Sequence, residues 1–155
     1  MSDQQFLEKA INLAKENVKV GGRPFGAVIV TNNTIIASGV NQIAQQGDPT
    51  AHAELQALRA ASKALGKVDL ADCTIYASGQ PCPMCLAAIR MVGISRVFYA
   101  YSNQDAAPFG LSTEKLAQQL RLLPQQQQDF VFVQLKITSQ VELYQLWQQQ
   151  QAIKH

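Results

Sequence analysis

Cysteine is scarce in this chain, which has three cysteines among 155 residues. Three thiols cannot all pair within one chain, and the first ten residues, MSDQQFLEKA, have neither the basic start nor the apolar stretch of a secretory signal. We therefore expect a cytoplasmic location, where reducing conditions disfavour disulfides. Stability must then come from a packed core rather than from covalent cross-links.

Charge and long apolar runs are also scarce. Charged residues make up 15% of the chain and the net charge is +2, a balance too mild to favour nucleic acid or a membrane surface as a partner. No run approaches the roughly 20 apolar residues that a membrane-spanning helix needs. Hydrophobic residues still make up 47% of the sequence, which is enough for the core of a single domain over residues 1–155.

Hydrophobic periodicity and turn residues predict an alternation of strands and helices. We expect a first helix over 2–19, capped by Ser2 and Gln5, then a hairpin of FGAVIV and TIIASGV turned at Asn32-Asn33, and a polar loop over 41–49. The other predicted strands span 73–78, 95–101 and 130–135, and the other helices run from about 50 to 66, from the cysteine pair to Gly93, over 113–122 and from Ser139 onward. This alternation favours an α/β fold with helices on both faces of a sheet.

Two short motifs, HAE at 52–54 and PCPMC at 81–85, each lie at the start of a predicted helix. A helix N-terminus favours the thiolate form of a nearby cysteine, and the thiolate is the form that binds metal. His52 supplies a third zinc ligand, whereas Cys73 lies inside a buried strand and His155 at the C-terminal end. Three protein ligands with one open position are typical of catalytic zinc sites.

Glu54 follows His52 by two residues, a spacing that does not direct both side chains to one ion. A carboxylate beside the open position can instead take a proton from water and deliver it elsewhere. With His52, Cys82 and Cys85 as ligands, zinc would lower the pKa of a bound water from about 15.7 to about 7, which suits hydrolysis. A redox dithiol would leave His52 and Glu54 without a role. A structural zinc module, which binds a partner and catalyses nothing, would leave Glu54 unexplained.

These two motifs match the zinc deaminase signature, and the chain resembles the cytidine deaminase-like superfamily. Within it, the chain is most similar to bacterial guanine deaminases and more distantly to tRNA adenosine deaminases. The resemblance runs through FLEKAINLA, GRPFGAVIV, DPTAHAELQALR, PCPMCLAAI, VFYAYSNQDAA and LYQLW. It implies a three-layer α/β/α cytidine deaminase-like fold with a mixed, roughly five-stranded central sheet.

The resemblance also implies roles for individual residues. His52, Cys82 and Cys85 would hold zinc, and Glu54 would shuttle the proton. In the purine pocket, Phe25 would stack on the base, Asn41 would hydrogen-bond to its edge, and Ala53 would contact the substrate.

The implied function is zinc-dependent deamination of a free purine base, with guanine converted to xanthine and ammonia. The implied assembly is a homodimer in which a C-terminal segment of about 130–155 can be exchanged between subunits. Deamination of tRNA adenosine, or of another free base or nucleoside such as cytosine, stays open. Beyond Ser102 the chain has four basic and four acidic residues, a balance that disfavours a nucleic-acid substrate.

Three positions depart from what the resembled enzymes have. Gln80 stands where family members commonly have glutamate, and Thr113 stands where guanine deaminases of this type can have an acidic residue, with Glu114 one step beyond. The chain ends in His155, where those enzymes can end in a tyrosine. All three departures concern substrate recognition and none concerns the zinc ligands.

Overall fold

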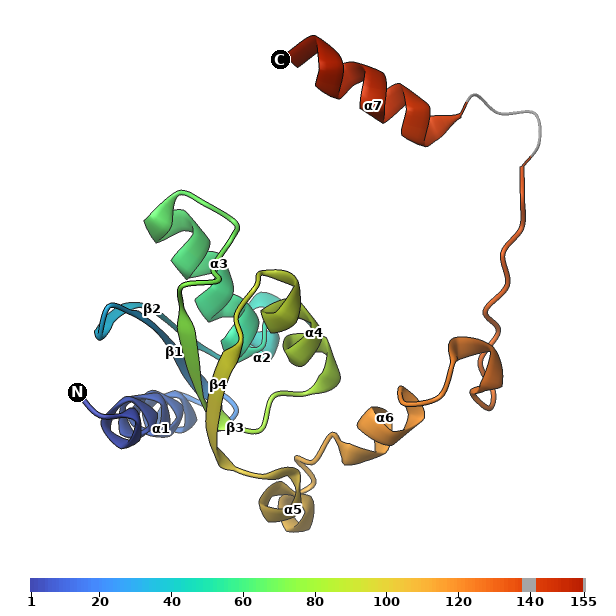
Figure 1. Ribbon diagram of the computed structural model, residues 1–155. Coiled ribbons are helices and arrows are strands. Elements are labelled where there is room, and N and C mark those ends of the chain that lie inside the picture. The colour runs from blue at the N-terminus through green and yellow to red at the C-terminus, as the bar shows by residue number, and fades with distance from the viewer. Residues whose placement is uncertain (138–141, 155) are drawn as a thin grey trace. The chain divides into compact units, whose positions relative to one another are not determined.

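The computed structural model describes residues 1–137 and 142–154, which belong to two compact units, Met1–Arg121 and Leu122–His155 (Figure 1). The first unit contains a four-stranded sheet in the order β2-β1-β3-β4. Its strands are β1 (Gly26–Thr31), β2 (Thr34–Val40), β3 (Thr74–Gly79) and β4 (Arg96–Tyr101). β1 is antiparallel to β2 and β3, whereas β3 and β4 are parallel, so the sheet is mixed as expected.

The helices divide between the two units. The first unit has α1 (Asp3–Lys19), α2 (Ile43–Gln46), α3 (Ala53–Leu65), α4 (Pro83–Met91), α5 (Asn103–Ala106), the 3₁₀ turn η1 (Ala107–Phe109) and α6 (Glu114–Gln119). The second unit has the 3₁₀ turn η2 (Pro124–Gln126) and α7 (Leu143–Lys154). Among the helices described, none is long and apolar enough to span a membrane.

One face of the sheet is covered by α1. The predicted capping box starts this helix: Ser2 N donates to Gln5 Oε1 at 2.8 Å, and Gln5 N donates to Ser2 Oγ at 3.2 Å. Phe6 packs its ring against Tyr76, with centroids 5.1 Å apart, in a buried cluster that also contains Val28. Phe6, Ala10 and Ala14 of the apolar stripe predicted for residues 2–19 are therefore buried against the sheet, whereas Val18 near its end is exposed.

The opposite face is covered by α3 and α4 (Figure 1). Ile29 of β1, Ile75 of β3 and Ile89 of α4 are fully buried in one cluster, which also contains the buried Leu58 of α3. Because neighbouring residues of β1 face opposite helix layers, the strand has an uninterrupted apolar sequence instead of an alternating one. This confirms the three-layer α/β/α arrangement.

The boundaries near the first site motif differ from the prediction. The hairpin turn at Asn32-Asn33 is as expected, with φ of 50° and 59°. The predicted helix start near Thr50 is wrong, because Asp48 Oδ1 accepts hydrogen bonds from Thr50 N at 2.8 Å and Thr50 Oγ1 at 2.7 Å and closes a separate turn. α3 starts at Ala53 instead. The loop predicted over 41–49 also contains the short helix α2.

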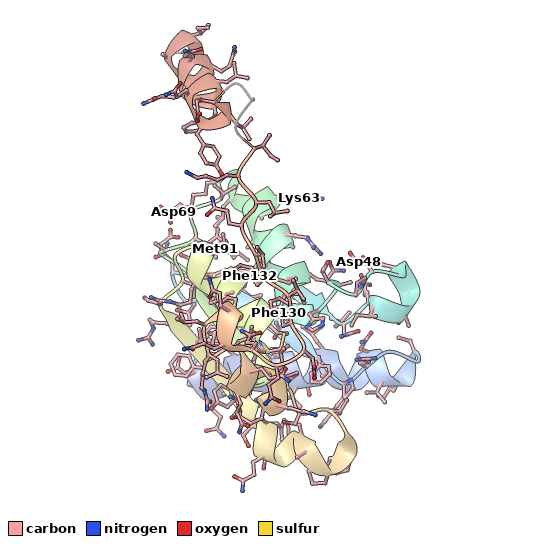
Figure 2. All side chains as sticks on the ribbon, turned by 90° about the vertical axis from the view of Figure 1, so that its right-hand side faces the viewer. Asp48, Lys63, Asp69, Met91, Phe130 and Phe132 are labelled. Carbon is pink, nitrogen blue, oxygen red and sulfur yellow. The ribbon has the colours of Figure 1, made fainter. Side chains whose placement is uncertain are left out.

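The expected fifth strand, over 130–135, is wrong for the part of the chain described here. This segment has no strand partner to receive its backbone hydrogen bonds, and an apolar segment cannot form a ladder alone. Phe130 and Phe132 stack their rings with centroids 6.0 Å apart (Figure 2). The last helix begins at Leu143, and its predicted cap, Ser139, lies outside the described residues. The helix predicted over 113–122 is shorter, Glu114–Gln119.

The contact between β2 and α3 depends on a glycine. A Cβ atom at Gly39 would lie 2.6 Å from Ala57 N and would also clash with the Ala53 carbonyl oxygen, both of them backbone atoms of α3. Gly39 therefore sets how closely the start of α3 approaches the sheet.

We predict that Gly39→Ala lowers the free energy of unfolding by about 1–3 kcal/mol, because the added methyl group pushes α3 away from the sheet. Chemical denaturation followed by circular dichroism measures the change. Ser38→Ala is the matched control on the exposed neighbouring position and should shift stability by less than about 0.5 kcal/mol. Equal stability of the two variants would contradict the prediction.

Candidate active site

Two helix starts meet beside the sheet and bring three ligand-type side chains together. His52 is the N-cap residue of α3, and Cys82 is the N-cap residue of α4. Pro83 occupies the first turn of α4, where a missing N–H costs nothing, and Cys85 follows two residues later. The His52 backbone is held on both sides: its N–H donates to Thr50 O at 2.7 Å, and its carbonyl accepts from Gln56 N at 3.0 Å.

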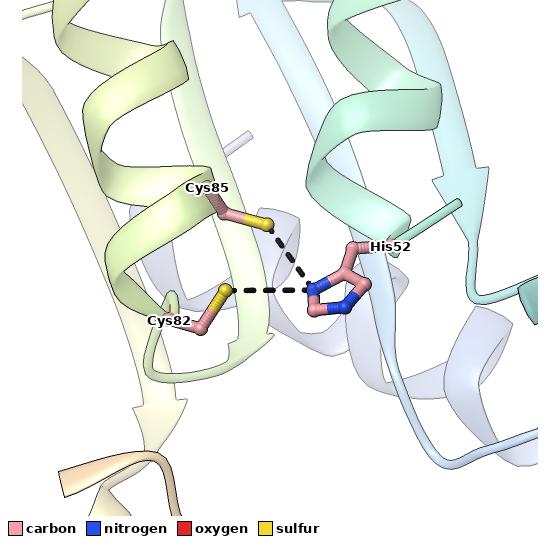
Figure 3. Close-up of side chains that lie close together, drawn as sticks. All are labelled: His52, Cys82 and Cys85. Carbon is pink, nitrogen blue, oxygen red and sulfur yellow. Dashed lines mark hydrogen bonds between the residues drawn. The ribbon is translucent and has the colours of Figure 1, made fainter. Parts of the chain in front are cut away.

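The geometry of the three side chains fits one zinc ion. His52 Nδ1 lies 3.5 Å from Cys82 Sγ and 3.4 Å from Cys85 Sγ (Figure 3), and the three ligand atoms all lie within 4.8 Å of one another. In a tetrahedral zinc site, nitrogen and sulfur ligands lie about 3.6 Å apart, given bond lengths of about 2.1 and 2.3 Å. One imidazole nitrogen and two sulfurs are also the donor set that zinc prefers.

The two thiols of this cluster differ in acidity. A hydrogen bond from the Cys85 thiol lowers the pKa of Cys82 to about 5, assisted by the backbone N–H groups of Cys85 and Met84 and by the nearby His52. The same interaction and burial raise the pKa of Cys85. The start of α4 therefore stabilises a thiolate at Cys82, the form in which cysteine binds metal.

Glu54 is the second residue of α3 and is only 6% exposed. Burial raises the pKa of its carboxyl group above the usual range, and the negative charge at Cys82 acts in the same direction. Carboxyl groups are common general acids and bases in enzymes. Glu54 follows the ligand-type residue His52 by two positions, and both side chains line the same cavity, a placement that suits proton transfer.

A cavity of about 260 Å³ lies beside the cluster. Six of the residues predicted for the site line it: Phe25, Asn41, His52, Ala53, Glu54 and Cys82. Cys85, the seventh, is fully buried next to His52 and does not line this cavity. The fold thus brings all of the sequence-predicted site residues to one place, although residue 25 and residue 85 are far apart in the chain.

Asn41 lines the cavity, and its amide is held by a hydrogen bond from the neighbouring backbone. Its side-chain Oδ1 accepts from Ile43 N at 3.2 Å, and its backbone carbonyl accepts from Asn17 Nδ2 at 2.9 Å. Within residues 1–137 and 142–154, no protein acceptor takes a hydrogen bond from Asn41 Nδ2, so its N–H groups are available to the cavity. The amide is thereby fixed as a hydrogen-bond donor.

Several residues of the site are not found from the motifs alone. Arg23 lines the cavity, and one wall is formed by residues 110–113, which follow the cysteine motif by about 25 positions. Asn17 Nδ2 also donates to Arg23 O at 2.8 Å, and Asn17 is buried on α1. The sequence contains one signal for this role, because Asn17 is a polar residue on the otherwise apolar stripe of the first predicted helix.

The positions that depart from the resembled enzymes have different locations. Gln80 and Thr113 line the cavity, whereas Glu114 does not. Cys73 is buried in the core cluster, as the sequence predicts. His155 lies outside the described residues.

Comparison with known proteins identifies relatives over almost the whole chain. The family described as "Cytidine and deoxycytidylate deaminase zinc-binding region" matches residues 1–101. A guanine deaminase of Bacillus subtilis is 42% identical over 148 residues, which cover 95% of this chain and 94% of the relative. A tRNA-specific adenosine deaminase of Buchnera aphidicola is 46% identical over 104 residues, which cover 66% of this chain and 64% of the relative.

Solved structures agree with this pattern. The X-ray structure of guanine deaminase from Bacillus subtilis has a TM-score of 0.88 at 41% identity, covering 96% of this chain and 95% of that one. A structure of guanine deaminase from Nitrosomonas europaea has a TM-score of 0.65 at 26% identity, covering 70% and 63%. The full-length likeness therefore includes the cavity wall at 110–113, which lies beyond the family match.

We predict that Cys85→Ala lowers the zinc affinity of the protein by at least roughly 100-fold, because one of three ligand atoms is lost. The metal content of protein equilibrated with limiting zinc, measured by elemental mass spectrometry, should fall from about one ion per chain to well below that. Cys73→Ala removes the third, remote cysteine and is the matched control, so its zinc content should stay at the wild-type level. Equal zinc content in both variants would refute this assignment.

Proposed function

This chain belongs to the cytidine and deoxycytidylate deaminase family, and from that premise we propose that it hydrolyses the amino group of a free purine base, with guanine converted to xanthine and ammonia. The observation that carries the proposal is the convergence of Glu54 and the His52, Cys82 and Cys85 cluster beside one small cavity. Likeness to a guanine deaminase over 95% of the chain supports guanine as the base.

His52, Cys82 and Cys85 are the residues that would hold zinc, whose chemistry when bound is to make a water molecule acidic enough to attack at neutral pH. Glu54 takes the proton from the attacking water on its carboxylate and delivers it to the departing amino group. Its buried position beside the cavity keeps bulk water from competing for this proton. One water molecule is consumed, the ring carbon becomes a carbonyl and ammonia leaves.

The other predicted residues orient the base. Phe25 lines the cavity, and an aromatic ring at this place suits stacking on a flat base. Asn41 donates its Nδ2 hydrogens to an acceptor on the edge of the base, since its oxygen is already bonded to Ile43 N. Ala53 is fully buried and lets the base approach the backbone at the start of α3.

We predict that Glu54→Gln lowers turnover of guanine by about 100- to 10,000-fold while the zinc content stays unchanged, because the amide cannot carry the proton. Spectrophotometric detection of xanthine with parallel metal analysis measures both quantities. Glu16→Gln, an exposed glutamate paired with Lys19, is the control and should keep full activity. Full activity of Glu54→Gln would exclude it as the proton shuttle.

Substrate choice is tested by ammonia release from guanine, adenine, cytosine, their nucleosides and tRNA under identical conditions. The proposal requires guanine to have the highest kcat/KM. Preference for tRNA, with binding that weakens steeply with salt, would replace it with tRNA adenosine deamination. Preference for cytosine or for a nucleoside would keep the deaminase and change its substrate.

We also infer that the protein is a cytoplasmic homodimer completed by its C-terminal segment, of about 130–155, in exchange between subunits. The support is apolar surface: Val131, Leu135 and Tyr144 are 90%, 81% and 84% exposed. Such a surface is costly in water and is typical of a segment that packs against a partner. A reducing compartment is proposed because Cys82 and Cys85 bind metal only as free thiolates.

We predict that Phe132→Asp weakens the dimer by at least about tenfold, because a charge replaces an apolar ring at the proposed subunit contact. Sedimentation velocity over a concentration series measures the monomer fraction. Gln134→Asp adds the same charge two residues away at a position that is already polar, and it should change the dimer little. A monomeric wild-type protein at micromolar concentration would refute the dimer.

A further inference from the structure

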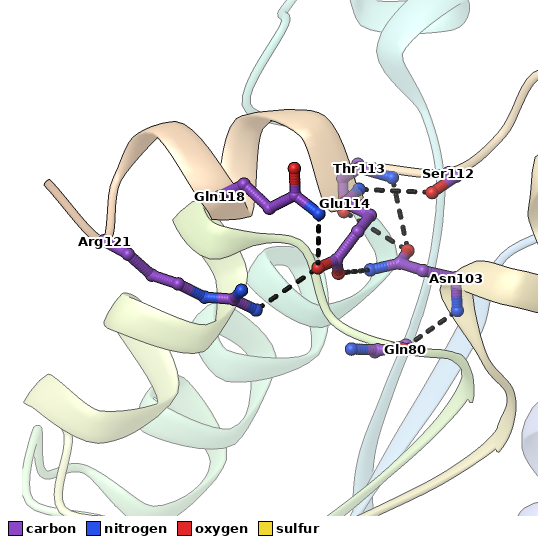
Figure 4. Close-up of polar contacts among 7 residues, drawn as sticks. All are labelled: Gln80, Asn103, Ser112, Thr113, Glu114, Gln118 and Arg121. Atoms are coloured by element: carbon purple, nitrogen blue, oxygen red, sulfur yellow. Dashed lines mark hydrogen bonds and ion pairs between the residues drawn. The ribbon is translucent and has the colours of Figure 1, made fainter. Parts of the chain in front are cut away.

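Asn103 lies at the centre of a polar network behind the cavity wall (Figure 4). It is the first residue of α5 and is 9% exposed. Its side-chain Oδ1 accepts from Thr113 N at 3.2 Å and from Thr113 Oγ1 at 3.5 Å, and its backbone N–H donates to Gln80 Oε1 at 2.9 Å. Asn103 thus connects Gln80, which follows β3, to Thr113, which lies in the cavity wall.

The wall attached in this way consists of residues 110–113, and all four line the cavity. Thr113 is its last residue and is the N-cap of α6, but its own side chain makes no capping bond. Within the described ranges, the side-chain hydrogen bonds that reach residues 110–113 from elsewhere in the fold come from Asn103, with Ser112 Oγ serving the neighbouring Glu114 N at 3.2 Å. Backbone hydrogen bonds from Gly110 N to Ala107 O at 3.1 Å and from Leu111 N to Ala106 O at 3.2 Å hold the first half of the wall. Asn103 is therefore the side-chain anchor of its Thr113 end.

Glu114 completes the network from the outer side. Its Oε2 accepts from Asn103 Nδ2 at 3.5 Å, and its Oε1 accepts from Arg121 Nη2 at 3.2 Å and Gln118 Nε2 at 3.5 Å. The carboxylate is thus used in fixing Asn103 and does not line the cavity. The wall itself presents Leu111, Ser112 and Thr113, which carry no charge.

We propose that Asn103 is a positioning residue for substrate binding: through Thr113 it holds the uncharged wall 110–113 at the distance that a planar base needs, and Gln80 and Glu114 fix its orientation. The inference rests on the proposed function for the identity of the base. Asn103 itself does not line the site cavity, so it acts through the wall and touches neither substrate nor metal ligands.

The first test is Asn103→Ala, which removes both the acceptor for Thr113 and the donor for Glu114. The KM for guanine should rise about tenfold, while kcat stays within about twofold and zinc content stays at the wild-type level. Gln118→Ala removes an exposed partner of Glu114 and is the control, with KM within about twofold of wild type. A fall in kcat at constant KM, or an unchanged KM, would overturn the proposal.

A second pair of variants separates this contact from general loss of stability. Asn103→Asp keeps the acceptor for Thr113 but sets a second carboxylate against Glu114, so KM should rise. Adding Glu114→Gln restores one donor and one acceptor with their roles reversed, and KM should return to within about threefold of wild type. A double variant no better than Asn103→Asp would contradict the assigned network.

A measurement that needs no substrate tests the role of Asn103 independently of the proposed guanine deamination. Hydrogen–deuterium exchange of the zinc-loaded protein should be faster in a peptide spanning 110–116 of Asn103→Ala, with peptides of β1 and β3 unchanged. Unchanged exchange at 110–116 would refute the positioning role. If guanine is not turned over by wild type, the kinetic test is repeated with whichever base is, while the exchange result stands independently.

Discussion

The site depends on two helices that begin at the same place. α3 starts directly after His52 and α4 directly after Cys82, so the first turns of both helices deliver their ligands to a common point. The Cys85 thiol and the free N–H groups at the start of α4 together favour the thiolate at Cys82. The cluster therefore forms only if both helices pack on the same face of the sheet. A substitution that disturbs this packing would also displace His52, Cys82 and Cys85.

Much of this arrangement could be predicted from the sequence because the signals are local. The apolar stripe and capping box of α1, the Asn32-Asn33 turn and the doubly buried run of β1 each depend on neighbouring residues. The residue spacings within the HAE and PCPMC motifs are short and are compatible with few functions other than metal binding. The two motifs come together in space because α3 and α4 pack on the same face of the sheet, and the alternation of strands and helices in the sequence already predicts such a layered fold.

The errors and omissions have non-local causes. The start of α3 shifted because Asp48 closes a turn on Thr50, a competition that helix-cap preferences do not resolve. The segment 130–135 has the composition of a strand, but a strand also needs a partner, which composition does not supply. The anchoring of the cavity wall by Asn103 joins residues ten positions apart on a loop and two short helices, where no periodic pattern exists.

Asn17 has a consequence for how the sequence can vary. Its amide nitrogen uses both hydrogens, on Arg23 O and Asn41 O, and a Cβ atom at Gly22 would lie 2.6 Å from Asn17 Cγ. The amide cannot swing aside without releasing the backbone carbonyl of Asn41, which lines the site cavity. A side chain at position 22 can therefore be accommodated only if the Asn17 side chain moves away or is replaced by a smaller one. A helix that covers the face of the sheet opposite to α3 and α4 thus holds the backbone of two residues that line the site cavity.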